Sequence, residues 1–329
     1  MIRRREFITL LGGAAAWPVV ARAQQGPRAR RIGILMPLPP TNAEAQARVR
    51  AFREELRKRG WAAGVNAQFD ERWTGDNMDL IRSSAAQLVE ANPDVILAVG
   101  GRVIPLLMAQ TSTIPIVIPG GTEPVERGYV KSLAEPGGNV TGFALMEISV
   151  IGKMLQTLKE IAPGIAHISM IQNPDNPATV IYSRAFTSAA ETLGLRPTVI
   201  HIRGFSDIER AIAATAAEPD GGILAASDLT IEALATETVA AVAQHRLPAI
   251  FPQRSFVMSG GLIYYGTDRV GLYRSCASYV DRILRGEKPG DLPYQQPTKY
   301  ELVINAKTAK TLGLTIPPRL LFTADEVIE

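Results

Sequence analysis

Polar side chains stand directly after several short apolar stretches of the sequence. Glu123, Asp228 and Asp268 are acids in such positions, where a carboxylate either binds an ammonium group or caps the following helix. Asn173 and Asn176 lie in the segment NPDNP, where amide groups serve a ligand or a turn equally well. These residue types predict a site for a small polar solute, with capping and turn formation as the alternative.

The glycine pair Gly100 and Gly101 is a second kind of candidate. The pair follows an apolar stretch and precedes an expected helix over residues 102–110. Free backbone amides and the helix dipole would then face an anion such as a carboxylate. Thr122 follows the next apolar stretch in the same manner. The alternative is that these residues make only tight turns and an N-cap.

Tyr264 and Tyr265 are adjacent in an expected strand, and neighbouring side chains of a strand point to opposite faces. Only one of the two rings can therefore face a ligand. We expect one ring to form an aromatic wall for the ligand and the other to lie in the core.

The sequence lacks the motifs of common enzyme classes. It contains no G-x-x-x-x-G-K-[ST], no G-x-G-x-x-G, no H-E-x-x-H and no G-x-S-x-G. Its three histidines, His167, His201 and His245, are scattered, and the single cysteine, Cys276, lies in an expected helix as a packing residue. We therefore predict a protein that is not an enzyme and that has no cofactor and no bound metal.

The elements that must position these residues alternate between strand and helix. Apolar strands such as RIGILMPL, DVILAVGG and IPIVIPGG are separated by amphipathic segments, the first of which opens with a capping-box pattern at Thr41 and Glu44. The scheme restarts with HISMIQ, RPTVIHI, GGILAASD and LPAIFPQ, separated by expected helices near residues 177–194, 207–217 and 230–246. This alternation predicts an α/β fold with mostly parallel sheets.

The two halves resemble each other. ILAVGG at 96–101 followed by IPIVIP at 114–119 parallels ILAASD at 223–228 followed by LPAIFP at 247–252. We therefore predict two Rossmann-like lobes built on one plan. Ligands of open α/β sheets lie beyond the carboxyl ends of the strands, so the loops of two facing lobes would surround one cleft, and a hinge would close it.

The first residues have the parts of an export signal. Arg3, Arg4 and Arg5 precede an apolar run over residues 7–20, and Ala21-Arg22-Ala23 fits cleavage after Ala23. The run is too short to span a bilayer. Residues 4–8 resemble a twin-arginine signal, and a Sec signal is the alternative. Both place the mature chain in the periplasm.

Composition excludes other partners. Removal of residues 1–23 leaves 31 basic and 31 acidic residues, so the apparent pI near 9.0 gives no support to nucleic-acid binding. A single cysteine also excludes an internal disulfide. The length of the mature chain fits two lobes, each able to bury a core.

Several longer motifs identify a family. PGGNVTG at 136–142, NPDNP at 173–177, YYGTD at 264–268, YVDRILRGEKPGDLP at 279–293 and QPTKYELVINAKTAKTLGLTIPP at 296–318 closely resemble the ABC transporter substrate-binding family that includes the TrpX-like proteins. The similarity runs through nearly the whole mature chain.

The resemblance implies a type I periplasmic binding-protein fold, with residues 31–143 and 269–296 in the first lobe and residues 144–268 and 297–329 in the second. It also implies a monomer that delivers a small solute to a membrane permease and its ATPase. The pocket positions that it carries over are Pro37, Gly100, Gly101, Thr122, Glu123, Asn173, Asn176, Ser227, Asp228, Tyr265 and Asp268. Glu123 and Thr267 depart from the aspartate and proline that we expect there, so the ligand can differ from that of better-known relatives.

We therefore predict a periplasmic receptor that closes on an amino acid or a small, even aromatic, carboxylate. A subunit that reports the ligand to a membrane signalling protein is the first alternative. An exported enzyme that contains a cofactor is the second, because twin-arginine cargo is exported folded.

Overall fold

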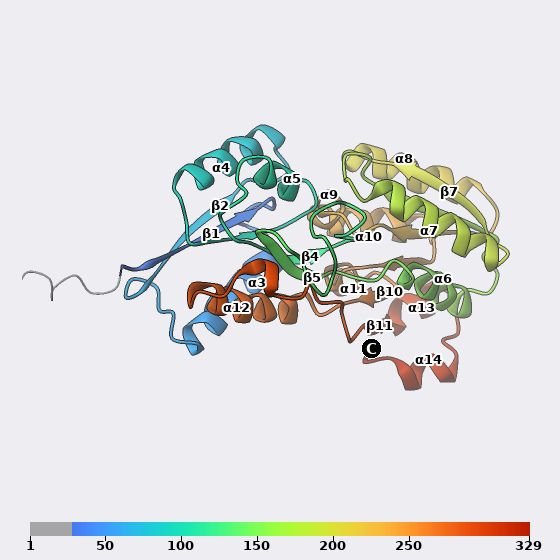
Figure 1. Cartoon of the computed structure of the whole chain (residues 1–329). Helices are drawn as coiled ribbons and strands as arrows, with labels where there is room; N and C mark the ends of the chain where they lie inside the picture. The colour runs from blue at the N-terminus through green and yellow to red at the C-terminus, as the bar shows by residue number, and fades with distance from the viewer. Residues whose placement is uncertain (1–27) are drawn as a thin grey trace, which may run out of the picture.

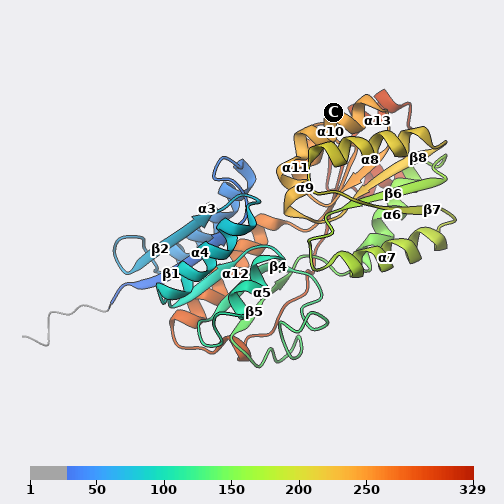
Figure 2. The same cartoon turned by 90° about the horizontal axis from the view of Figure 1, so that it is seen from above.

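Two separate β-sheets organise residues 28–329, which are the residues that the computed structural model describes. Figures 1 and 2 show the sheets side by side, each covered by helices, so the chain forms two lobes. We call the unit built on the five-stranded sheet the first lobe and the unit built on the seven-stranded sheet the second lobe. The expected export signal, residues 1–23, lies outside the described residues.

The first sheet is parallel throughout, in the order β2-β1-β3-β4-β5. Its strands are β1 (Arg30–Met36), β2 (Ala67–Trp73), β3 (Val95–Ala98), β4 (Ile116–Gly121) and β5 (Val140–Ala144). The second sheet has the order β12-β11-β10-β9-β8-β6-β7, and only the β10–β11 pair is antiparallel. Its strands are β6 (His167–Gln172), β7 (Arg196–His201), β8 (Gly221–Ala225), β9 (Ala249–Phe251), β10 (Ile263–Gly266), β11 (Glu301–Asn305) and β12 (Glu326–Ile328).

Both lobes repeat one strand order. In chain order within each lobe, the second strand lies at one side, the first is next to it, and the third and fourth follow on the other side. This shared arrangement agrees with the predicted repeat, because β3–β4 and β8–β9 hold the two similar sequence segments. It also places a reversal of strand order beside β1 in the first lobe and beside β6 in the second.

Helices cover both faces of each sheet. In the first lobe these are α3 (Ala43–Lys58), α4 (Met78–Glu90), α5 (Val103–Met108) and α12 (Arg269–Leu284). In the second lobe they are α6 (Val150–Ile161), α7 (Thr179–Thr192), α8 (Phe205–Ala217), α9 (Leu229–Ala233), α10 (Ala235–Gln244), α11 (Arg254–Met258), α13 (Ala306–Leu312) and α14 (Pro318–Thr323). A short 3-10 helix spans Pro289–Asp291.

Burial on both faces explains why the central strands are continuously apolar. Ile34 of β1 packs in the cluster beneath α3 and α12, whereas its neighbour Leu35 packs in the cluster beneath α4 and α5. Both side chains are fully buried. Parallel strands covered by helices on both sides need apolar residues at successive positions.

The chain returns to the first lobe late. Helix α12 begins directly after β10 of the second sheet, and Tyr273 and Val280 of α12 pack in one cluster with Ile32 of β1 and Phe52 of α3. Figure 1 shows this helix beneath the first sheet, beside α3. The core of the first lobe is therefore built from both ends of the described chain.

Two local predictions are wrong. The expected helix over 230–246 is broken at Leu234 into α9 and α10. The start of α3 is capped by Asn42, whose side chain accepts a hydrogen bond from the amide of Ala45 at 2.9 Å, and not by Thr41. Asparagine is as good an N-cap as threonine, so the capping-box pattern alone could not distinguish Asn42 from Thr41 as the cap.

Gly142 explains part of the PGGNVTG motif. Its φ angle is 153°, and a Cβ at this position would lie 2.3 Å from the carbonyl oxygen of Ile118. Strand β5 can therefore approach β4 this closely only with glycine at this position.

Within residues 28–329, no helix is both long enough and apolar enough to cross a membrane.

Candidate functional site

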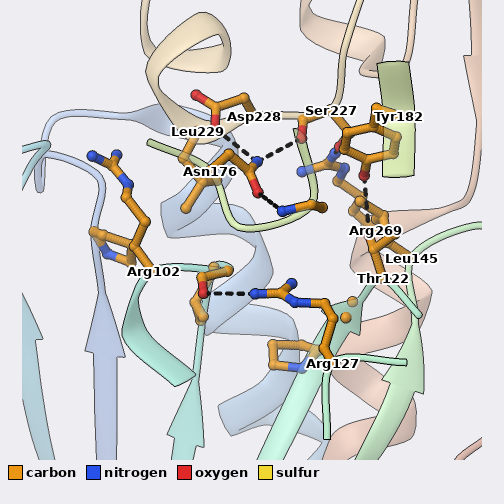
Figure 3. Close-up of a pocket in the computed structure, with 18 of the residues that line it drawn as sticks. Arg102, Thr122, Arg127, Leu145, Asn176, Tyr182, Ser227, Asp228, Leu229 and Arg269 are labelled. Carbon is orange, nitrogen blue, oxygen red and sulfur yellow. Dashed lines mark hydrogen bonds between the residues drawn. The ribbon is translucent and has the colours of Figure 1, made fainter. Parts of the chain in front are cut away.

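A cavity of about 70 Å³ lies where the carboxyl ends of the two sheets face each other (Figure 3). Pro37 and Gly100 follow β1 and β3, and Ser227 follows β8. The cavity therefore lies at the point in each lobe where the strand order reverses. This is the position at which open α/β sheets bind ligands. The lining residues are Pro37, Arg48, Val99, Gly100, Gly101, Arg102, Pro119, Gly120, Gly121, Thr122, Arg127, Leu145, Asn176, Ala178, Tyr182, Ser227, Asp228, Leu229, Arg269 and Tyr273.

Hydrogen bonds between the lobes hold the cavity closed at one side. The hydroxyl of Thr230 in α9 donates to Asp76 of the first lobe at 2.6 Å. The same oxygen accepts from Arg102 of the first lobe at 3.2 Å and from Asn173 of the second at 2.9 Å. Arg102 also pairs with Asp76, so these four side chains form one network across the cleft.

A second connection runs from Thr122 to Tyr182. Their hydroxyls are 3.0 Å apart, and the two residues come from the first and second lobes. Both residues are buried. This bond and the Thr230 network show that the structure has the closed arrangement of the lobes.

A buried ion-pair cluster forms the third connection. Glu232 of α9 pairs with Arg48 of α3, and also with Arg269 at the start of α12, at 2.9 Å. Burial by itself would raise the pKa of the Glu232 carboxyl, but the two guanidinium groups outweigh that effect and hold the pKa below its usual value. Glu232 is therefore charged in the closed protein.

Most charges that line the cavity are already neutralised by acids outside the lining. Arg48 pairs with Glu232 and Glu44, Arg269 pairs with Glu232, and Arg102 pairs with Asp76. The lining therefore contains three arginines that are occupied by protein carboxylates.

Arg127 and Asp228 are different, because neither has an ion-pair partner among residues 28–329. The guanidinium of Arg127 donates to the carbonyl of Gly101 at 3.2 Å and lies 4.5 Å from the centre of the Tyr129 ring. Figure 3 shows Arg127 and Asp228 on opposite sides of Asn176. The cavity thus offers one cation and one anion that no charged side chain of the described residues neutralises.

The amides of NPDNP hold Asp228 in place. Asn176 donates to one carboxylate oxygen of Asp228 at 2.9 Å, and the other oxygen accepts from the amide of Thr230 at 2.8 Å as the N-cap of α9. Asn173 reaches Asp228 at 3.5 Å and Thr230 at 2.9 Å. The motif therefore positions an acid at the cavity.

Gly100 marks a close approach between the lobes. Its φ angle is 88°, and a Cβ there would lie 2.6 Å from the side chain of Leu229 in α9 and 3.3 Å from Pro37. Leu229 reaches across the cleft and packs against the apolar cluster of the first lobe. A larger residue at position 100 would strain the backbone and force the end of the Leu229 side chain to move.

The structure brings seven of the predicted site residues into the cavity lining. These are Pro37, Gly100, Gly101, Thr122, Asn176, Ser227 and Asp228. All but Asn176 lie within three residues after the end of a strand, as the α/β rule predicts.

Four predicted site residues lie outside this lining. Asn173 is buried and donates a hydrogen bond to Asp228, and Glu123 lies next to the lining residue Thr122 with a φ angle of 44°. Asp268 is the N-cap of α12, accepting from the amide of Gly271 at 2.9 Å. The ring of Tyr265 stacks on that of Tyr300, with centroids 6.0 Å apart.

The expected helix at 102–110 is only the six-residue α5, and Arg102 makes no side-chain cap. The dipole of this short helix is therefore a weaker candidate for binding an anion than the nearby guanidinium of Arg127.

Sequence reasoning missed six polar lining residues, which are Arg48, Arg102, Arg127, Tyr182, Arg269 and Tyr273. Arg127 lies in a loop six residues after β4, Tyr182 lies inside α7, and Arg269 and Tyr273 lie in the first turns of α12. No local pattern marks them, because their positions depend on how helices approach the cleft. Within the described part of the chain, no group of three or more histidine, cysteine, aspartate or glutamate residues could hold a metal.

The chain belongs to the ABC transporter substrate binding protein family, whose pattern it matches over residues 39–328. Its fold is that of the type I periplasmic binding proteins.

A tyrosine-binding protein of Clostridioides difficile strain R20291 is 27% identical over 266 residues, which are 80% of this chain and 76% of the relative. A conserved domain protein of Vibrio cholerae O1 biovar El Tor is 28% identical with a TM-score of 0.85, covering 91% of this chain and 100% of that one.

A structure from Streptococcus pneumonia in complex with L-Trp is 23% identical and has a TM-score of 0.82, with the same coverage. A ligand-free, open substrate binding protein of Clostridium difficile is 24% identical but has a TM-score of 0.67, covering 91% and 99% of the two chains.

Proposed function

We propose that this protein is the solute receptor of an ABC importer and that it binds an α-amino acid as its zwitterion. The observation that carries the proposal is the pair of unneutralised charges in the cavity, Arg127 and Asp228. An α-amino acid carries one carboxylate and one ammonium group, so it complements both charges without changing the net charge of the closed cleft.

Each charge suits its half of the ligand. The planar guanidinium of Arg127 can bind a carboxylate through two parallel hydrogen bonds, which are among the stronger interactions in proteins. Asp228 is held by Asn176 and the α9 amide, so its position is fixed before the ligand arrives. Groups that are already ordered lose little entropy on binding.

The relatives support the amino-acid class. The Clostridioides difficile relative is named as a tyrosine-binding protein, and the Streptococcus structure contains L-Trp. We carry over only the class of ligand, because these sequences are 27% and 23% identical to this one.

Closure supports the transport role. Three sets of contacts join the lobes over the cavity, namely Thr230 with Asp76, Thr122 with Tyr182, and Glu232 with Arg48. A ligand that contacts both lobes favours the closed state by its differential affinity. The closed surface would then be recognised by a permease and its ATPase, and the receptor itself needs no catalytic residue.

We also propose that the mature chain is periplasmic after cleavage following Ala23. The basic cluster, the short apolar run and Ala21-Arg22-Ala23 support this proposal. The mass of the protein recovered from the periplasm of its host tests the cleavage site. Replacing Arg4 and Arg5 with lysine abolishes export if the signal is of the twin-arginine type and leaves it intact if it is a Sec signal.

Isothermal titration with amino acids and their derivatives tests the ligand class. A bound L-amino acid should lose affinity as its methyl ester and as its deaminated acid, because each derivative leaves either Arg127 or Asp228 unmatched. A ligand at about 100 times its Kd should also stabilise the fold by about 2.7 kcal/mol. Equal binding of the acid and the ester would contradict the proposal. Loss of solute uptake on deletion of the protein would separate transport from a signalling role.

A further inference from the structure

The closed cavity is small for the aromatic ligands named for the relatives. Its volume is about 70 Å³, whereas a cavity that accommodates benzene measures about 150 Å³. The walls are tied across the cleft by Thr230 with Asp76 and by Thr122 with Tyr182. Widening the cavity enough for an indole or phenol would require these bonds to break.

Leu229 takes up the space that a larger ligand would need. Its side chain comes from α9 of the second lobe, lies against Gly100, and packs on the apolar cluster of the first lobe. Because it contacts both lobes in the closed state, Leu229 limits the length of any ligand that allows full closure.

Two residues of the cavity lining each have a buried donor atom without a hydrogen-bond partner among residues 28–329. These atoms are the hydroxyl of Tyr273 and the Nε of Arg269. The other guanidinium nitrogens of Arg269 are occupied, because they donate to Glu232 and to Ser227 at 2.9 Å each. Tyr273 is 2% exposed, so water does not reach its hydroxyl freely.

Buried donors without acceptors destabilise the state that buries them, and nearly all buried polar groups in proteins are paired. Both donors are contributed by the first turns of α12, next to the crossing from β10. An oxygen acceptor on the ligand would satisfy them and favour closure at that point.

We propose that the cavity selects a small α-amino acid whose side chain carries an oxygen acceptor, which Tyr273 and Arg269 bind, and that Leu229 excludes aromatic amino acids. This inference rests on the proposed function, because Arg127 and Asp228 must hold the ends common to all amino acids. The acceptor is either a hydroxyl or a carboxylate, and the experiment below separates the two.

The test is isothermal titration of ligand-free protein with matched amino acids. L-serine is compared with L-alanine, L-aspartate with L-leucine, and L-tyrosine with L-phenylalanine and L-tryptophan. We expect serine or aspartate to bind tightest of the amino acids tested. Its affinity should be at least about tenfold higher than that of its matched partner, because one hydrogen bond to a buried donor contributes that much. Serine as the tighter ligand identifies a hydroxyl acceptor, and aspartate identifies a carboxylate.

Three variants test the residues. Tyr273→Phe should lower the serine-to-alanine or aspartate-to-leucine ratio toward one while leaving the oxygen-free partner unaffected, and that partner's affinity also reports whether the variant folds. Tyr279→Phe is the matched control, because this phenol is on the same helix, donates to the carbonyl of Pro293 and lies outside the cavity lining. Leu229→Ala should admit L-phenylalanine.

The outcomes are distinguishable. Tighter binding of tryptophan or tyrosine than of every small amino acid overturns the inference but leaves the amino-acid class intact. If Tyr273→Phe lowers the affinity equally for serine and alanine, or equally for aspartate and leucine, the inference is also overturned. Absence of binding by any amino acid overturns the proposed function itself, and the inference with it.

Discussion

Glu232 of the second lobe is paired with Arg48 of the first, and the two side chains are 1% and 3% exposed. The pair is completed by Arg269, which begins the helix that returns from the second lobe to the first. An ion pair at this depth joins the lobes independently of any ligand, so it sets how stable the closed state is before binding.

Replacement of Glu232 with glutamine should strongly destabilise the protein. The change leaves the buried Arg48 and the partly buried Arg269 without their shared carboxylate, and breaking a buried pair on one side costs about 3–5 kcal/mol. Urea unfolding followed by circular dichroism measures this loss. Glu126→Gln is the control, because Glu126 pairs with Arg184 at the surface and should change stability by less than about 1 kcal/mol. Similar losses in the two variants would show that Glu232 does not anchor the cluster.

The same carboxylate predicts an acid dependence of stability. The pKa of Glu232 in the folded protein lies below its usual value of 4.5, because its two guanidinium partners outweigh the effect of burial. Its contribution is therefore complete above about pH 4.5 and is lost as the pH falls through the lower, folded pKa. The free energy of unfolding should fall more steeply below pH 4.5 in the wild type than in Glu232→Gln. Parallel profiles would contradict this assignment.

Arg127→Lys should weaken amino-acid binding by about tenfold to a hundredfold. Lysine keeps the charge but cannot make the two parallel hydrogen bonds of a guanidinium to a carboxylate. Titration with whichever amino acid binds the wild type measures the change, with Arg184→Lys as an exposed control outside the cavity. An unchanged Kd in Arg127→Lys would remove Arg127 from the site.

Asp228→Asn separates ligand binding from capping. Asparagine caps helices as well as aspartate does, so α9 should be kept, but its amide nitrogen would face the amide donor of Asn176 and the melting temperature should fall modestly. The attraction for a ligand ammonium group would be lost, and affinity should fall at least about tenfold, as for other hydrogen bonds to charged groups. A large fall in melting temperature together with unchanged affinity would show that Asp228 is only a structural cap.

Thr230→Val should open the ligand-free protein. Valine keeps the shape of threonine but loses the oxygen that links Asp76, Arg102 and Asn173. Fluorescence energy transfer between labels at Ser83→Cys in α4 and Ser188→Cys in α7 reports the separation of the lobes. Cys276 does not interfere, because it is fully buried and burial raises the pKa of its thiol.

Energy transfer in the ligand-free variant should decrease, and ligand dissociation should be faster than in the wild type. Thr236→Val on α10 is the control, since Thr236 is exposed and its hydroxyl reaches only Ser259, at 3.5 Å. Equal transfer in Thr230→Val and Thr236→Val would show that the Thr230 network does not govern closure.

The fold could be predicted from the sequence because each central strand is apolar at successive positions, as Ile34 and Leu35 illustrate. Strand ends then located much of the cavity, including Gly100 and Asp228. Prediction from local sequence fails where one sequence pattern is compatible with two different side-chain environments. Alternation along β10 placed Tyr264 and Tyr265 on opposite faces but could not show that Tyr265 would stack on Tyr300.

Residues that approach the cavity from another element carry no local signal. Arg127 belongs to a loop and Tyr273 to a helix of the opposite end of the chain, and each reaches the cleft only through tertiary packing. Asp268 is the opposite case. Its position after a strand predicts an acid that binds the ligand, but its side chain caps α12 instead.

The late return of α12 to the first lobe also has a consequence for biosynthesis. Until residues 269–292 have left the ribosome, Ile32 and Phe52 lack the apolar partners that cover them in the finished protein. The first half of the chain therefore cannot complete its core during translation, and both lobes must become native almost together, after nearly the whole polypeptide has been made.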